Sequence, residues 1–133
     1  MPVPQILVVV PERIVALDIQ HMLGSRGYTG ISFAYSGEEA RMKAVEARPD
    51  AIIMDITLRD SLDGLKTGSD LQKELNVPVI YLSSIPRQLV RDKPAGNSGT
   101  IQEFVYKPFS EDDIRSALER ALKNRGFPQS TDG

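Results

Sequence analysis

The feature that most constrains the fold is a short apolar run that ends in a carboxylate, Ala51-Ile52-Ile53-Met54-Asp55. An uninterrupted apolar run of this kind is typical of a strand buried on both faces, as in a parallel sheet covered by helices. The carboxyl end of such a strand is where open α/β sheets place their chemistry. We therefore take Asp55 as the centre of the predicted functional site.

Three further apolar runs also end in polar residues. They span residues 6–10, 77–82 and 104–106, and they lead into Pro11-Glu12, Ser83-Ser84 and Lys107-Pro108. If all these strands are parallel, their carboxyl ends meet at one edge of the sheet. The sequence therefore predicts a rim formed by Glu12, Asp55, Ser83 and Lys107.

Helical patterns separate these strands. Residues spaced i, i+4, i+7 and i+8 predict a helix after the first strand, with Pro11 at its first position and an end near Gly24 or Gly27. Its apolar face consists of Val15, Ile19, Met22 and Leu23.

Three more helices are expected. A capping box at Ser36-Gly37-Glu38-Glu39 begins a second helix, whose alanines 40, 44 and 47 are expected to point inward. Residues 57–66 are predicted to be a polar loop, followed by a third helix around residues 69–75. Ser110 is predicted to cap a last helix with an apolar stripe at Ile114, Leu118, Ala121 and Leu122.

This alternation of strands and helices indicates βα units and a mostly parallel sheet. A short strand at residues 31–34 brings the number of expected strands to five. Right-handed crossovers favour the strand order 2-1-3-4-5, the flavodoxin-like arrangement. We predict a three-layer α/β/α sandwich that forms one domain over residues 1–125, with a flexible tail or linker over residues 126–133.

Composition excludes several classes of function. The net charge of −2 gives no electrostatic reason to expect nucleic acid or an anionic membrane as a partner. With no cysteine, neither a disulfide nor a thiolate metal site is possible. No apolar run approaches the roughly 18–20 residues of a membrane span, and the N-terminus lacks a signal-peptide pattern, so a cytoplasmic location is expected. His21, the only histidine, is interpreted as a surface residue.

One segment interrupts the alternation. Residues 84–102 contain two prolines and two glycines, and only residues 87–92 have a helical pattern. We interpret this segment as a variable surface loop with a stunted helix. The alternative is a remodelled surface for a partner.

The sequence resembles the receiver domain of response regulators, the CheY-like family, from about Ile6 to Leu122. The matching pieces are residues 6–9, 49–56, 63–64, 78–83 and 107–109, whose order and spacing carry the resemblance together. The resemblance implies that Asp55 accepts a phosphoryl group from a phosphohistidine. It further implies that Ser83 binds a phosphate oxygen, that Lys107 pairs with its charge, and that Ser83 and Phe104 act as switch residues. Lys107-Pro108 is expected to be a cis peptide.

The sequence departs from this family at the metal site. Receivers carry two adjacent acids after the first strand, and these hold Mg²⁺; Val10 and Pro11 occupy their positions here. Asp55, the carbonyl group of Thr57 and, as a weak candidate, Glu12 remain as ligands, a small set for an ion that demands near-octahedral oxygen coordination. Mg²⁺ is therefore expected to bind weakly or not at all.

Three hypotheses of function follow. The first is a receiver in a two-component phosphorelay with impaired Mg²⁺-dependent phosphorylation, and the second is a pseudo-receiver that works as a phosphorylation-independent interaction module. The third, an Asp-nucleophile phosphatase, is set aside because Thr57 stands where such enzymes need a second acid. We expect no enzyme activity beyond phosphoryl transfer to Asp55. The expected partners are a histidine kinase or phosphotransfer protein, or other domains of a longer parent chain, because residues 126–133 are too few for an output domain.

Overall fold

The computed structural model describes residues 3–58, 63–83 and 102–124. Within these ranges it contains five strands, β1 to β5, at Gln5–Val9, Gly30–Ala34, Ala51–Asp55, Val79–Ser83 and Gln102–Tyr106. The helices α1 to α4 of the same ranges span Arg13–Gly24, Gly37–Ala47, Asp63–Leu75 and Glu111–Asn124. Most of the segment at 84–102 that interrupts the alternation, and the predicted tail, lie outside the described residues.

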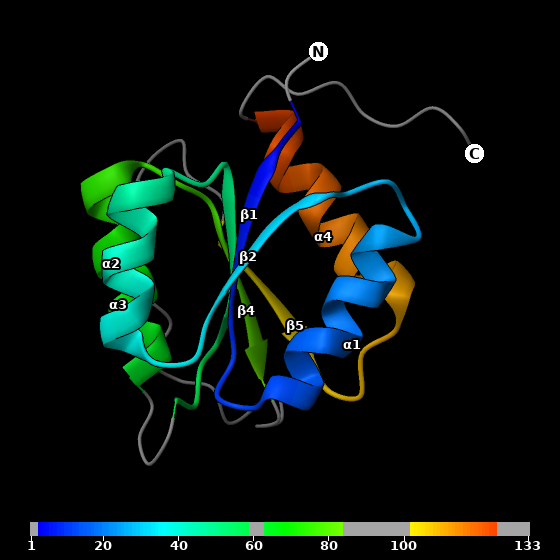
Figure 1. Cartoon of the computed structure of the whole chain (residues 1–133), viewed down its shortest axis with the longest axis horizontal. Helices are drawn as coiled ribbons and strands as arrows, with labels where there is room; N and C mark the ends of the chain where they lie inside the picture. The colour runs from blue at the N-terminus through cyan, green and yellow to red at the C-terminus, as the bar shows by residue number, and fades with distance from the viewer. Residues whose placement is uncertain (1–2, 59–62, 84–101, 125–133) are drawn as a thin grey trace.

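All five strands are parallel and form one sheet in the order β2-β1-β3-β4-β5, which confirms the predicted topology. The register places Val9 beside Met54, and Asp55 beside Leu82 on the next strand. Because the strands run in one direction, their carboxyl ends lie together at the lower edge of the sheet in Figure 1. This edge carries the residues predicted to form the rim.

Two helices cover each face of the sheet, as Figure 1 shows, with α1 and α4 on the right and α2 and α3 on the left. The apolar side chains of the strands alternate between these layers. Ile6, Val8 and Ile53 pack towards α1 and α4. Leu7 and Met54 pack towards α2 and α3. This two-sided burial explains why the β3 sequence is apolar throughout.

Three local predictions need correction. Pro11 is not the first residue of α1, because Glu12 is the N-cap and its carbonyl group accepts the first helical bond from Ala16. Ala40 and Ala44 are buried as predicted, but Ala47 is exposed. It is the last residue of α2, and the chain leaves the helix through Arg48 in the left-handed conformation (φ 46°).

The third correction concerns α3, which begins at Asp63 and not near residue 69. The polar residues at its start belong to the helix because Gly64 allows close packing against the end of β3. A Cβ atom on Gly64 would overlap the carbonyl oxygen of Asp55 and lie 2.7 Å from the Cα atom of Ile56. The absence of a side chain at residue 64 therefore sets the position of α3 relative to Asp55.

The predicted helix caps of α2 and α4 are confirmed. Ser36 Oγ accepts a hydrogen bond from the Glu39 amide, and Ser110 Oγ accepts one from the Asp113 amide. Among the residues that the structure describes, no helix combines the length and the apolar character needed to cross a bilayer.

Candidate functional site

Asp55 lies at the carboxyl end of β3, and only 5% of its surface is exposed. Its Oδ1 atom accepts a hydrogen bond from the backbone N–H of Thr57 at 2.9 Å. Its Oδ2 atom lies 3.1 Å from Lys107 Nζ, an ion pair between the ends of β3 and β5. The carboxylate is thus held in one orientation by a fixed backbone donor and a cation.

Lys107 and Ser83 come together at the same edge, as predicted. Ser83 ends β4 and is fully buried, and its carbonyl oxygen accepts a hydrogen bond from the Lys107 amide at 2.8 Å. The expected cis peptide between Lys107 and Pro108 is present. The Lys107 side chain is 30% exposed, so solvent reaches the edge of the ion pair with Asp55.

Phe104 on β5 stacks on two tyrosines. Its ring centroid lies 5.1 Å from that of Tyr81 and 6.1 Å from that of Tyr106. Sequence reasoning missed Tyr81, which is fully buried on β4 among the apolar residues of its strand. Burial raises the pKa of the Tyr81 hydroxyl, and the nearby charge of Asp70 raises it further. This hydroxyl has no hydrogen-bond partner in the part of the chain that the structure describes.

The residues that could contribute oxygen ligands are few. Val10 follows β1 at the level of Asp55 on the neighbouring strand, but its side chain is fully buried in the apolar cluster beneath α1 and α4. Pro11 offers no side-chain ligand. Glu12 is exposed, and its side chain makes no capping bond to α1. Across residues 3–58, 63–83 and 102–124, no three histidine or acidic side chains gather around one point.

Comparison with known proteins identifies the family. The family model described as the response regulator receiver domain matches residues 6–119. The chain belongs to this family. Similar solved structures include a signal receiver domain of a modulated diguanylate cyclase from Desulfovibrio desulfuricans G20, with a TM-score of 0.73 at 26% identity over 93% of this chain and 98% of that one.

Two curated relatives illustrate the similarity of this receiver domain to longer regulators. The phyllosphere-induced regulator PhyR of Methylorubrum extorquens is 30% identical over 122 residues, which cover 89% of this chain and 43% of that protein. The transcriptional regulatory protein PrrA of Mycobacterium leprae is 34% identical over 124 residues, covering 92% of this chain and 52% of that protein. The chain thus spans about half the length of the curated relatives it matches.

A solved structure matches this receiver domain over nearly its full length. It is the N-terminal domain of a response regulator/sensory box/GGDEF three-domain protein from Carboxydothermus hydrogenoformans, with a TM-score of 0.75 at 29% identity. The alignment covers 92% of this chain and 96% of that one. In that protein, the domain of this size is one part of a larger chain.

Proposed function

We propose that this receiver domain serves two-component phosphorelay signalling with Asp55 as its phosphoacceptor. The single observation that carries the proposal is the pairing of Asp55 with Lys107 at 3.1 Å at the carboxyl edge of the sheet. Ser83 ends β4, the strand between β3 and β5, and is the third family site residue present at this edge. Phe104, stacked on Tyr81, is the proposed aromatic switch residue, together with Ser83.

The chemistry requires positioning and neutralisation of charge. An oxygen of Asp55 forms the new P–O bond while the P–N bond of a phosphohistidine breaks, and the imidazole leaves. Charge spreads over the three equatorial phosphoryl oxygens during this transfer. Lys107 supplies one cation next to Asp55 Oδ2, at the carboxyl edge of the sheet. The Thr57 amide holds the other carboxylate oxygen, Asp55 Oδ1. The chain itself is proposed to catalyse no reaction beyond this transfer.

We further propose that Mg²⁺ binds here weakly or not at all. Mg²⁺ needs near-octahedral oxygen ligands and is usually held by one or two carboxylates with several water molecules. Asp55 supplies one carboxylate, whose oxygens also contact the Thr57 amide and Lys107 Nζ. Val10 is buried among apolar side chains, and Glu12 is exposed at the start of α1. The donor set therefore does not fit the ion, and phosphorylation of Asp55 is expected to be impaired.

The proposed partners are a histidine kinase or a phosphotransfer protein. Further domains of a longer chain are a second source of partners, because the matched relatives are about twice the length of this chain. Neither nucleic acid nor a membrane is proposed as a direct partner of this domain.

A pseudo-receiver is the second candidate function. In this alternative, the domain binds a protein partner without phosphorylation, and the ion pair between Asp55 and Lys107 is a fixed structural link. The buried Val10 is the specific observation that favours it, because an apolar residue stands where the family needs an acid.

Incubation with acetyl phosphate, with and without Mg²⁺, separates the two functions. Intact-mass spectrometry should show a slow gain of one phosphoryl group that is nearly independent of Mg²⁺ and absent from Asp55→Asn. A chain that gains no phosphoryl group from acetyl phosphate, nor from a phosphorylated histidine phosphotransfer protein, would support the pseudo-receiver.

A further inference from the structure

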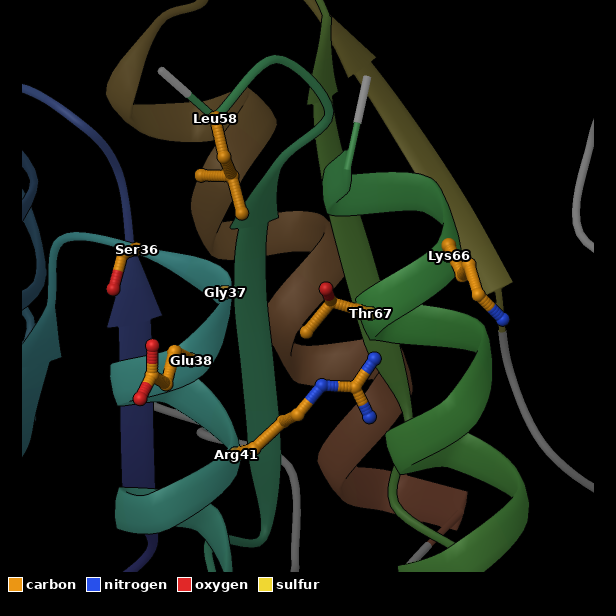
Figure 2. A pocket seen from close by; sticks show the side chains of 7 residues that line it. All are labelled: Ser36, Gly37, Glu38, Arg41, Leu58, Lys66 and Thr67. Carbon is orange, nitrogen blue, oxygen red and sulfur yellow. The ribbon is translucent and has the colours of Figure 1, made fainter. Parts of the chain in front are cut away.

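A hollow lies apart from the Asp55–Lys107 pair, between the N-terminal turns of α2 and α3. It has a volume of about 690 Å³, within the range of small-molecule sites. Figure 2 shows Arg41 reaching from α2 towards α3 and the side chain of Leu58 pointing into the hollow. The residues that line it are Ser36, Gly37, Glu38, Arg41, Leu58, Lys66 and Thr67.

Thr67 is the first sign that this hollow receives a polar ligand. Only 4% of its surface is exposed, and its hydroxyl faces the space between the two helices (Figure 2). The side-chain hydrogen bonds formed around the hollow by described residues, from Arg41 to Asp70 and from the Glu39 amide to Ser36, do not involve this hydroxyl. Because Thr67 lines the hollow, its hydroxyl can donate a hydrogen bond to an oxygen atom of a ligand there.

The start of α2 supplies further donors beside Thr67. A Cβ atom on Gly37 would lie 2.8 Å from Thr67 Oγ1, so the backbone of α2 approaches this hydroxyl closely. Ser36 satisfies the amides of Glu39 and Ala40. The amides of Gly37 and Glu38 have no acceptor within the part of the chain that the structure describes. Two open amides at a helix N-terminus form a ready site for an anion.

The charges around the hollow are mixed. Arg41 uses one guanidinium nitrogen to bind Asp70 at 2.8 Å, and Lys66 lies 3.5 Å from the same carboxylate. The hydrogen bond from Arg41 lowers the pKa of Asp70. The remaining N–H groups of Arg41 are open to a ligand among the described residues. Glu38 opposes an anion, but in Figure 2 its carboxylate lies beside Ser36, on the side of α2 turned away from Thr67.

We propose that this hollow binds the phosphate group of a small phosphorylated compound. The groups that donate hydrogen bonds to the phosphate are the Gly37 and Glu38 amides, the Thr67 hydroxyl and the guanidinium group of Arg41. A phosphate offers several acceptor oxygens, and this set presents donors from two helices. Leu58 contacts the part of the compound attached to the phosphate. The proposal is independent of phosphorylation at Asp55.

Titration of the ¹⁵N-labelled protein with inorganic phosphate tests the site. The amide signals of Gly37, Glu38 and Thr67 should shift and saturate, and they should do so equally in Asp55→Asn. Thr67→Val removes the hydroxyl with little change of shape and should weaken binding about tenfold or more. Arg41→Gln should weaken it by about fivefold or more. The same spectra report whether each variant is folded.

Two matched variants sharpen the test. Lys73→Gln removes one positive charge from the last turn of α3, away from the hollow, and should change the affinity by less than about twofold because exposed distant charges are screened. Glu38→Gln removes the opposing carboxylate and should strengthen binding roughly two- to fivefold. Phenyl phosphate should bind more tightly than inorganic phosphate through Leu58; equal binding in the same hollow would identify free phosphate as the ligand.

Three results would overturn the proposal. The first is an absence of shifts at Gly37 and Glu38 with phosphate at tens of millimolar. The second is shifts confined to Thr57, Ser83 and Lys107, which would place the anion at the Asp55 edge. The third is equal affinity in Thr67→Val, Arg41→Gln and Lys73→Gln, which would indicate unspecific attraction. None of these results bears on phosphoryl transfer to Asp55, which is measured separately with acetyl phosphate.

Discussion

At the scale of single residues, the contact between Asp55 and Lys107 decides how this domain differs from a receiver with an intact acidic pocket. Where three carboxylates crowd together, removal of one relieves repulsion and stabilises the fold. Here Val10 and Pro11 contribute no carboxylates, and Lys107 lies 3.1 Å from Asp55 Oδ2. The Asp55 carboxylate is therefore paired with a cation, and removing its charge should not relieve repulsion.

Asp55→Asn tests this difference. The variant keeps an oxygen acceptor for the Thr57 amide but loses the ionic contact with Lys107, so its free energy of unfolding should fall by about 0.5–2 kcal/mol or stay nearly unchanged. Urea melts at neutral pH in chelator measure this. A cycle with Lys107→Met isolates the pair. An increase above about 1 kcal/mol would mean that Asp55 is strained by Glu12 or another acid.

Tyr81 gives a second test at this scale, because its buried hydroxyl has no partner among the described residues. Tyr81→Phe keeps the stack on Phe104 and removes the unpaired polar group. The free energy of unfolding should stay unchanged or rise by about 1 kcal/mol. Tyr106→Phe, on the half-buried end of the same stack, is the control and should change little. A loss above about 1 kcal/mol in Tyr81→Phe alone would show that the hydroxyl is hydrogen-bonded.

At the scale of elements, the position of α3 depends on Gly64. Gly64→Ala places a methyl group against the carbonyl group of Asp55, so either α3 or the end of β3 must move. The variant should lose about 2–3 kcal/mol of stability, as overpacked sites do, and the signals of Asp55 and Thr57 should shift. Gly24→Ala is the matched control, because nothing lies within 4 Å of its Cβ position at the end of α1. Equal stabilities of the two variants would refute this role of Gly64.

The same helix shows where sequence reasoning stops. The strands and their order could be predicted because apolar runs and βα alternation are local patterns, and the rim followed from the parallel direction of the strands. The start of α3 could not, because three of residues 63–66 are Asp, Gly and Lys, and the segment resembles a loop. The position of that turn depends on the packing of Gly64 against the end of β3, a tertiary contact that the local pattern does not reveal. The sequence also could not predict that the hydroxyl group of Tyr81 lacks a hydrogen-bond partner among the described residues. Hydrogen bonding depends on spatial neighbours, which a sequence pattern does not give.

At the scale of the whole molecule, metal binding and stability are linked. An ion that binds only the folded state stabilises it by an amount that depends on the ratio of its concentration to Kd. If Val10 and Pro11 have removed the metal ligands, thermal melts of this chain should coincide in chelator and in millimolar Mg²⁺. An upward shift with Mg²⁺ that Asp55→Asn abolishes would show that the site is intact.

The double variant Val10→Glu with Pro11→Asp should restore the metal site, because Asp55, Ser83 and Lys107 are already in place. Val10 is fully buried in the apolar cluster, so a carboxylate there costs stability when no cation is present. In chelator the double variant should therefore melt below the natural chain. Millimolar Mg²⁺ should raise its melting temperature and speed its phosphorylation by acetyl phosphate, while the natural chain responds to neither. Val10→Gln with Pro11→Asn keeps the shape without the charges and should lack both responses. A folded double variant that ignores Mg²⁺ would show that the acidic pair is not what this receiver domain lacks.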